Sequence, residues 1–394
     1  SDPRKQSPRA AYATGNVEKG FAVAQTAPLP VPDLLRRPQG MPAAPMPLAP
    51  QPAIPKPSRN LEFVSKSADE ALDYYADHFG PYPYGGLMLT QFPGTVSQGW
   101  PGLVFLSSYS FLTPPELEQV QHDPVDRLGT EIIISHEIAH QWWGDLVTWN
   151  GYRDQWIMEA LANYSALMLL ESKNPVAFHR LMQRYRDDLL EKSDDDSVLM
   201  DAGPVTFGQR LSSSKFPDAY QAISYGRGTW IFHMLRTMLD DAAPAQSTKG
   251  TDQPFLRALR TLRKDYEGKA ITTSQLLSVF EAQLPKPLWY EGKKSLEWFY
   301  DSWLSGTAVP RFELHDVKIG GTKSMPLVSG TIVQKDAPDT LVTAVPLYAV
   351  VGTRTVLLRR VFADGSETPF RLTAPVGTRK ILIDPEQTLL SRAK

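Results

Sequence analysis

The 394-residue sequence contains no cysteine, so disulfide bonds and thiolate metal ligands are excluded. It has no apolar run of about eighteen residues, the length that a membrane-spanning helix needs. Its 41 lysines and arginines nearly balance its 43 aspartates and glutamates, for a net charge of −2. We therefore expect neither nucleic acid nor an anionic membrane as a partner. Both an exported bacterial (periplasmic) protein and a cytoplasmic one tolerate this lack of cysteine, so the compartment stays open.

Proline is abundant, with 34 residues, and many of them fall between residues 28 and 57. Such a density of proline excludes a helix or a central strand, because proline lacks the backbone N–H and fixes φ. We predict that residues 1–58 form a proline-rich extension or linker. A partner with an aromatic groove for this arm is the less favoured alternative.

The most informative motif is His136-Glu137-Ile138-Ala139-His140. Histidines four residues apart lie on one face of a helix, and both rings then reach one Zn²⁺. The intervening Glu137 suits a general base acting on water. Two satisfied surface histidines would be the alternative. The apolar flanks, 132–134 and 142–143, predict a buried helix instead, where these side chains are costly without a shared partner.

A catalytic zinc site needs a third protein ligand and keeps the fourth position for water. Glu159 follows His140 after eighteen residues and lies in the apolar run Trp156-Ile157-Met158-Glu159-Ala160-Leu161. A lone carboxylate in such a run is expected to be paired or coordinating. We predict one Zn²⁺ per chain, held by His136, His140 and Glu159.

The segment at residues 136–148, HEIAHQWWGDLVT, resembles the zinc helix of the aminopeptidase N family of gluzincin metallopeptidases. The eighteen-residue spacing to the glutamate is that of the family, whereas Asn-Glu-Gly in the family reads Met158-Glu159-Ala160 here. Residues 71–84 and 225–235 extend the resemblance. It implies a zinc-dependent peptidase acting on peptide substrates. It also implies that Tyr225, followed by Arg227 where the family has lysine, stabilises the tetrahedral intermediate.

One departure bears on specificity. The family binds the free α-amine of its substrate through the glutamate of a Gly-Ala-Met-Glu-Asn motif. The matching stretch here, residues 96–105, has no acidic residue. The resemblance nevertheless places substrate-binding positions in this stretch, at Gln98, Gly99, Trp100 and Gly102. We expect a weakened preference for a free N-terminus, with Asp201 as one substitute anchor to consider.

The pattern of elements predicts an α+β protein. A thermolysin-like, mainly helical catalytic domain is expected over residues 59–309 and a small β-sandwich over residues 310–394, where alternation replaces helical periodicity. We predict a short strand and then a helix between Leu61 and Phe79, a helix that begins at Asp123-Pro124, and an edge strand at Pro346. The family usually has a large β domain before the catalytic one. Its absence suggests a fragment, a processed form or a shortened relative.

The sequence therefore favours a zinc peptidase of aminopeptidase type in which Glu137 is the base and Tyr225 the oxyanion donor. Asp154 is a candidate partner for a ligand histidine. Two alternatives stay open, namely an epoxide hydrolase activity on the same site and a non-catalytic zinc-bound interaction protein. The cleavage preference, exo- or endopeptidase action and the oligomeric state do not follow from the sequence.

Overall fold

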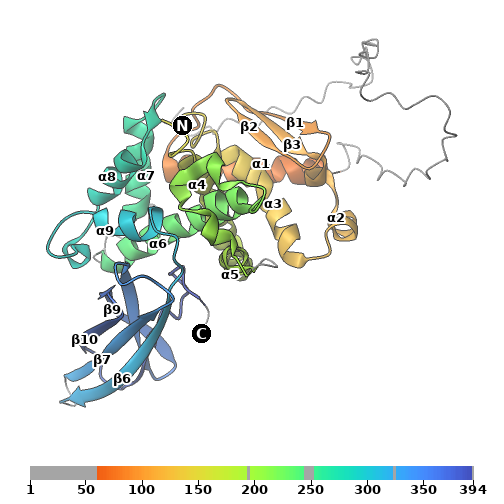
Figure 1. Ribbon diagram of the computed structural model, residues 1–394. Helices are drawn as coiled ribbons and strands as arrows, with labels where there is room; N and C mark the ends of the chain where they lie inside the picture. The colour runs from red at the N-terminus through yellow and green to blue at the C-terminus, as the bar shows by residue number, and fades with distance from the viewer. Residues whose placement is uncertain (1–59, 193–195, 244–252, 323–324, 393–394) are drawn as a thin grey trace, which may run out of the picture.

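A computed structural model describes residues 60–192, 196–243, 253–322 and 325–392. The predicted proline-rich extension, residues 1–58, lies outside this range. As Figure 1 shows, the helices gather in one part and the last six strands form a second part that projects from it. The chain is thus an α+β protein in which strands follow helices, as predicted.

The helical part contains nine α-helices among the described residues, and they are α1 (Leu61–Phe79), α2 (Pro114–Val120), α3 (Pro124–Ala139), α4 (Trp156–Lys173), α5 (Pro175–Leu190), α6 (Gly228–Ala242), α7 (Pro254–Asp265), α8 (Thr273–Glu281) and α9 (Glu297–Phe299). Short 3₁₀ segments cover Ser108–Phe111, Leu199–Ala202, Val205–Leu211 and Lys286–Leu288, and two π-helical turns cover Gln221–Arg227 and Tyr300–Leu304.

Local sequence signals set where the central helices begin. The Asp123 side chain accepts a hydrogen bond from the Val125 N–H at 2.8 Å, and Pro124 occupies the first turn of α3. Both features satisfy the free N–H groups of a helix start. Helix α4 is apolar around nearly its whole circumference, and most of its residues are buried. It therefore forms the centre of the helical part, with α3, α5 and α6 packed around it.

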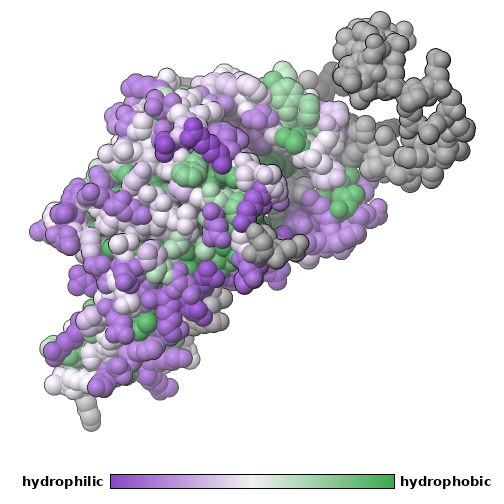
Figure 2. Space-filling model, in the orientation of Figure 1, coloured by the Kyte–Doolittle hydropathy of each residue, from purple (hydrophilic) through white to green (hydrophobic). Residues whose placement is uncertain are grey.

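A small sheet lies against α3. It has the order β1-β3-β2, with β1 (Met88–Phe92) parallel and β2 (Gln98–Trp100) antiparallel to β3 (Leu103–Ser107). Figure 2 shows apolar surface over the region where Figure 1 places this sheet. A two-residue pair, β4 (Thr148–Trp149) with β5 (Ala270–Ile271), closes the loop after α3.

The strands after Pro310 form two three-stranded antiparallel sheets, which we call the C-terminal sheet pair. The first has the order β10-β7-β6 and the second the order β11-β8-β9. Their bounds are β6 (Arg311–Gly321), β7 (Pro326–Lys335), β8 (Val342–Val351), β9 (Arg354–Asp364), β10 (Glu367–Thr373) and β11 (Thr378–Ile383). Buried side chains such as Val328, Ile332 and Leu347 fill the space between them.

Two predictions about elements were wrong. The whole of Leu61–Phe79 is one helix, with no strand within this range, because its buried residues follow helical spacing from Val64 onward. Pro346 lies in β8, the central strand of its sheet rather than an edge. The last pair between β8 and β11 is Leu347 with Ile383, one residue away. Proline is tolerated there because the ladder with β11 ends beside it.

None of the helices in the described ranges is both long enough and apolar enough to cross a membrane.

Candidate metal and catalytic site

The last turn of α3 places His136 and His140 side by side. Their Nε2 atoms are 3.1 Å apart, and both side chains are buried. This is the geometry expected of residues four apart on one helix face. Burial and the neighbouring His140 lower the pKa of His136 to about 3, so its ring is neutral at ordinary pH. A neutral imidazole is the form that binds a metal ion.

Glu159 reaches the two histidines from the first turn of α4. Its Oε2 lies 3.9 Å from Nε2 of His136 and 3.5 Å from Nε2 of His140. Ligand atoms about 2.0–2.2 Å from a tetrahedral Zn²⁺ lie roughly 3.3–3.6 Å from one another. The three donor atoms therefore surround a space of the size that one zinc ion fills.

The Glu159 carboxylate is the clearest sign of a metal site. Its Oε2 is buried and has no hydrogen-bond partner of ordinary geometry. Burial opposes its ionisation, but the nearby His140 outweighs this effect and holds the pKa of Glu159 well below its usual range. An ionised, buried and unsatisfied oxygen that faces two imidazoles is costly unless a cation shares the space. Two imidazoles and one carboxylate form a donor set that suits Zn²⁺.

Each ligand histidine has a second partner that orients its ring. The Nδ1 of His140 lies 2.9 Å from the Trp143 carbonyl oxygen, which only accepts, so Nδ1 carries a proton and Nε2 is the ring nitrogen that faces Glu159. The Asn163 side chain hydrogen-bonds His136 and raises its pKa slightly against burial. Asn163 is itself held by Thr229, to whose Oγ1 it donates at 2.9 Å.

Sequence reasoning missed both orienting groups. A backbone carbonyl leaves no mark in a sequence, so Trp143 could not be found in that way. Asn163 left a signal, since it lies four residues after Glu159 and therefore on the same face of α4. Asp154, the residue predicted to orient a ligand histidine, contacts the start of α8. Its Oδ1 accepts from the N–H of Thr273 at 2.7 Å and from the Thr273 hydroxyl at 2.9 Å.

Glu137 lies beside the histidines and is buried. Burial raises the pKa of its carboxyl to about 7, against the opposing effects of the His140 charge and of a hydrogen bond from the Gly99 backbone N–H. The ring of Tyr225 also lies at the cluster and stacks on that of His136 with 5.8 Å between centroids. Burial and the Glu159 carboxylate, which its hydroxyl contacts, raise the pKa of Tyr225, so the phenol stays a hydrogen-bond donor.

The predicted substrate-binding stretch forms β2 and lies directly over the last turn of α3. The Gln141 side chain fixes it there by accepting from the Gly102 N–H at 2.8 Å and donating to the Trp100 carbonyl at 2.8 Å. A Cβ at Gly99 would lie 2.8 Å from the Glu137 carbonyl oxygen. This position therefore has no room for a side chain.

The remaining side chains of the stretch do not form an anionic anchor. The Gln98 amide donates to the Gly99 carbonyl at 3.1 Å, and the Trp100 ring is exposed. Asp201, considered as a substitute anchor, instead accepts from the Val198 N–H at 3.0 Å and caps its own turn. Within the described ranges, the cluster of His, Asp and Glu side chains with metal-binding geometry is His136, His140 and Glu159.

A cavity of about 470 Å³ opens beside His136 and Tyr225 and runs between α3 and α5. Most of its lining residues are uncharged, and they include the polar Asn163, Tyr185 and Gln221. At the far end Arg184 pairs with Asp188 at 2.7 Å and contacts Asp126 at 3.6 Å. His136 and Tyr225 thus face a space large enough for part of an extended peptide.

The comparisons with known proteins agree with this geometry. The protein-family model described as the Peptidase family M1 domain matches residues 63–303, which are more than half of the chain. Endoplasmic reticulum aminopeptidase 2 of Bos taurus is 27% identical over 183 residues, which are 45% of this chain and 18% of that relative. Aminopeptidase N of Lactococcus lactis subsp. cremoris is 26% identical over 187 residues, 46% of this chain and 21% of that relative.

The fold is also similar to a solved structure, the crystal structure of Legionella pneumophila aminopeptidase A in complex with aspartic acid. The TM-score is 0.60 at 17% sequence identity, and the similarity covers 86% of this chain and 35% of that one. The matched parts thus span about a third or less of the length of these relatives.

Proposed function

Because this chain belongs to peptidase family M1, we propose that it is a zinc-dependent peptidase with a weakened requirement for a free substrate N-terminus. The observation that carries the proposal is the cluster of His136, His140 and Glu159, whose donor atoms lie 3.1–3.9 Å apart. Glu137 and Tyr225 both lie beside this cluster. The thermolysin-like character of the helical part belongs to the same proposal.

His136, His140 and Glu159 would hold the zinc ion, which when bound supplies a Lewis acid that activates water and polarises a carbonyl. Glu137 would take the proton of the attacking water and return it to the leaving amine. Its pKa of about 7 suits a group that must accept and then release a proton near neutral pH.

Tyr225 would donate its hydroxyl hydrogen bond to the carbonyl oxygen as negative charge develops there. Its pKa lies above the ordinary phenol value. The proton therefore stays on the tyrosine while the hydrogen bond strengthens, so the contribution belongs to the transition state rather than to substrate binding.

The specificity proposal rests on β2. A side chain has no room at Gly99, and Gln98 supplies only a neutral amide. A hydrogen bond to a charged group contributes about 1.5–3 kcal/mol, so an anchored amine gives a preference of roughly 10- to 150-fold for a free N-terminus. We expect this chain to show less than about a tenfold preference.

Alanine p-nitroanilide, its N-acetyl derivative and an internally quenched peptide test the proposal when each is assayed with and without 1,10-phenanthroline. We expect hydrolysis that the chelator abolishes and comparable rates on the free and acetylated substrates. A preference above about 100-fold for the free amine would show that another carboxylate anchors it. Stoichiometric zinc without hydrolysis of any of the three would favour the non-catalytic alternative.

A further inference from the structure

Tyr225 lies in an unusual piece of backbone. The turn Gln221–Arg227 is π-helical and continues directly into α6, whose first residue is Gly228. A π-helical turn holds one more residue than an α-helical turn and is rare except in short stretches, often at functional sites. Such a turn persists only where the surrounding structure holds it. The position of the Tyr225 hydroxyl therefore depends on what anchors this turn.

Arg227, the last residue of the turn, is the strongest anchor. Its side chain is 1% exposed. The guanidinium donates hydrogen bonds to four backbone carbonyls, those of Trp303 (3.2 Å), Gly306 (2.8 Å), Thr307 (3.0 Å) and Ala308 (3.3 Å). No carboxylate of the described chain pairs with it, and burial lowers its pKa to about 10. A buried cation of this kind is costly unless its donors are satisfied, and here each of the three guanidinium nitrogens donates to at least one of these carbonyls.

The next residue fixes the turn on its other side. A Cβ at Gly228 would lie 2.5 Å from the Cβ of Ala160, so the start of α6 packs directly on α4. Ala160 follows the proposed ligand Glu159 in the chain. The turn that carries Tyr225 is thus held between the helix of the third ligand and the segment 303–308, which leads into β6.

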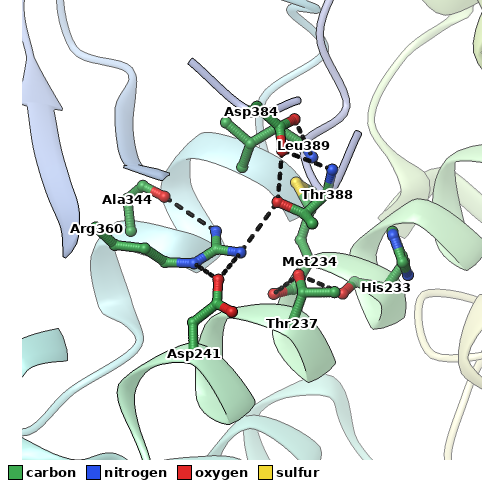
Figure 3. Close-up of polar contacts among 9 residues, drawn as sticks. All are labelled: His233, Met234, Thr237, Asp241, Ala344, Arg360, Asp384, Thr388 and Leu389. Carbon is green, nitrogen blue, oxygen red and sulfur yellow. Dashed lines mark hydrogen bonds and ion pairs between the residues drawn. The ribbon is translucent and has the colours of Figure 1, made fainter. Parts of the chain in front are cut away.

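The other end of α6 is also tied to the C-terminal sheet pair (Figure 3). Arg360 of β9 donates to the Asp241 carboxylate at 2.8 Å from Nε, to the Ala344 carbonyl at 3.1 Å and to the Thr388 hydroxyl at 3.0 Å. Asp384 in turn accepts from the N–H and the hydroxyl of Thr388, both at 2.8 Å. The helix that follows Tyr225 is therefore fastened at both ends to residues that precede or form the sheets.

We propose that Arg227 is a positioning residue for Tyr225, which holds the tyrosine hydroxyl at the reacting carbonyl by tying the π-helical turn to the segment 303–308. The inference rests on the role of Tyr225 in the proposed function. The arginine fork matters because its donors point in several directions within one plane, and they reach carbonyls spread over six residues. A lysine ammonium carries its three donors on one nitrogen and reaches fewer of them.

A double-mutant cycle tests the inference on the full-length, zinc-loaded chain with the fastest substrate of the panel above. Arg227→Lys should lower kcat between about 10- and 100-fold at nearly unchanged KM, because the donor is misplaced and the binding groups are not. In the Tyr225→Phe background the same substitution should change kcat less than about twofold, since the hydroxyl that it positions is gone.

Arg236→Lys is the matched control. Arg236 is a partly buried arginine on α6, but it bonds Tyr164 at 3.3 Å and pairs with Glu171 rather than with segment 303–308. The Arg236→Lys substitution should leave kcat unchanged, and it should also leave unchanged the factor by which Tyr225→Phe lowers kcat. Zinc content should stay stoichiometric in all variants, because no proposed ligand is altered.

A readout without turnover is hydrogen exchange of the zinc-free protein. Amides of residues 221–228 should exchange at least about tenfold faster in Arg227→Lys than in wild type, with α7 unchanged. If Tyr225→Phe itself has wild-type kcat, the role of Tyr225 in the proposed function fails. If Tyr225→Phe has a low kcat but the effects of the two substitutions on kcat multiply in the double mutant, the positioning role fails instead.

If the circular dichroism spectrum shows that the Arg227→Lys variant does not fold, the cycle is repeated with Arg227→Gln. Loss of fold in both variants with a folded Arg236→Lys would show a purely structural arginine and overturn the inference.

Discussion

At the scale of single residues, hydrogen-bond partners hold the polar side chains of the site in place. The Trp143 carbonyl orients the ring of His140, and Asn163 bonds the ring of His136. Because these contacts already hold the rings, little rotamer entropy remains to be lost when a metal ion binds. Metal binding should stabilise the Glu159 carboxylate most, because its Oε2 is buried and has no hydrogen-bond partner.

His140→Ala should lose most of the bound zinc. The substitution removes one of three proposed ligand atoms and leaves Glu159 facing a single imidazole. Metal analysis after gel filtration measures this loss. His179, a histidine on α5 outside the cluster, supplies the matched control, and His179→Ala should keep one zinc per chain. Equal zinc in both variants would contradict the ligand assignment.

Glu137→Gln should keep the zinc and the fold but lose hydrolysis. The amide preserves the shape of the side chain and can accept from the Gly99 N–H, yet it cannot take a proton. Removal of a positioned base typically lowers turnover by about 10²- to 10⁴-fold. Zinc content and kcat are measured on the same sample, and turnover at the wild-type rate would rule out Glu137 as the base.

The residue-level predictions from the sequence differ in how much support they have received. The HExxH motif and Glu159 were found because ligand spacing on helices is a local property, and the family they indicated is confirmed. The roles of Glu137 and Tyr225 stay predictions, although the structure brings both to the cluster. The role of Asp154 also stays a prediction, and its Oδ1 contacts Thr273 at the start of α8.

At the scale of elements, β2 and the last turn of α3 form one unit. The strand backbone bonds Glu137 through Gly99, and Gln141 holds the turn after the strand. Close backbone approach is the reason for glycine at position 99.

Gly99→Ala should therefore destabilise the folded chain and lower its rate of hydrolysis. Its Cβ would lie 2.8 Å from the Glu137 carbonyl oxygen and 3.0 Å from the Cβ of His140, so the strand must move. Overpacking of this kind costs about 1–3 kcal/mol. The control is Gly129→Ala in the middle of α3, where a Cβ meets nothing within 4 Å. It should stabilise by up to about 1 kcal/mol. Urea unfolding of the two variants shows whether their effects have opposite signs.

Helix starts were predictable from the sequence because caps are local. Asp123 caps α3 as predicted, and Thr272 bonds Gln275 in a capping box at α8. Strand positions were less predictable, since they depend on neighbours distant in the chain. Pro346 was placed on an edge by a local rule, yet it lies in a central strand because β11 happens to end beside it.

At the scale of the whole molecule, the helical part and the C-terminal sheet pair meet in a polar junction rather than an apolar one alone. The Arg360 side chain is 3% exposed and the Asp241 side chain 23%. Burial raises the pKa of Asp241, and the arginine charge opposes that rise. The division into domains at residues 58 and 309 stays a prediction, although the change from helices to strands after Pro310 agrees with it.

Arg360→Met should weaken this junction strongly. It leaves Asp241 without its cation and the Ala344 carbonyl without a donor. Removing one partner of a buried pair costs about 3–5 kcal/mol, and the partial exposure of Asp241 brings the expected loss toward the lower figure. Arg359→Met, at the exposed neighbour on β9, should stay within about 0.5 kcal/mol of wild type. Denaturation midpoints of the two variants measure the difference, and equal midpoints would contradict the prediction.

The order of the ligands along the chain has a consequence for folding. His136 and His140 come together as soon as a single helical turn forms, whereas Glu159 arrives only when α4 packs on α3. A partly folded chain in which α3 has formed alone therefore brings together two of the three proposed ligands, and the packed chain brings together all three. A ligand that binds the native state more tightly than the denatured ensemble shifts the equilibrium by mass action. Zinc uptake during refolding thus acts as a reporter of tertiary assembly, and it should lag behind the appearance of helix.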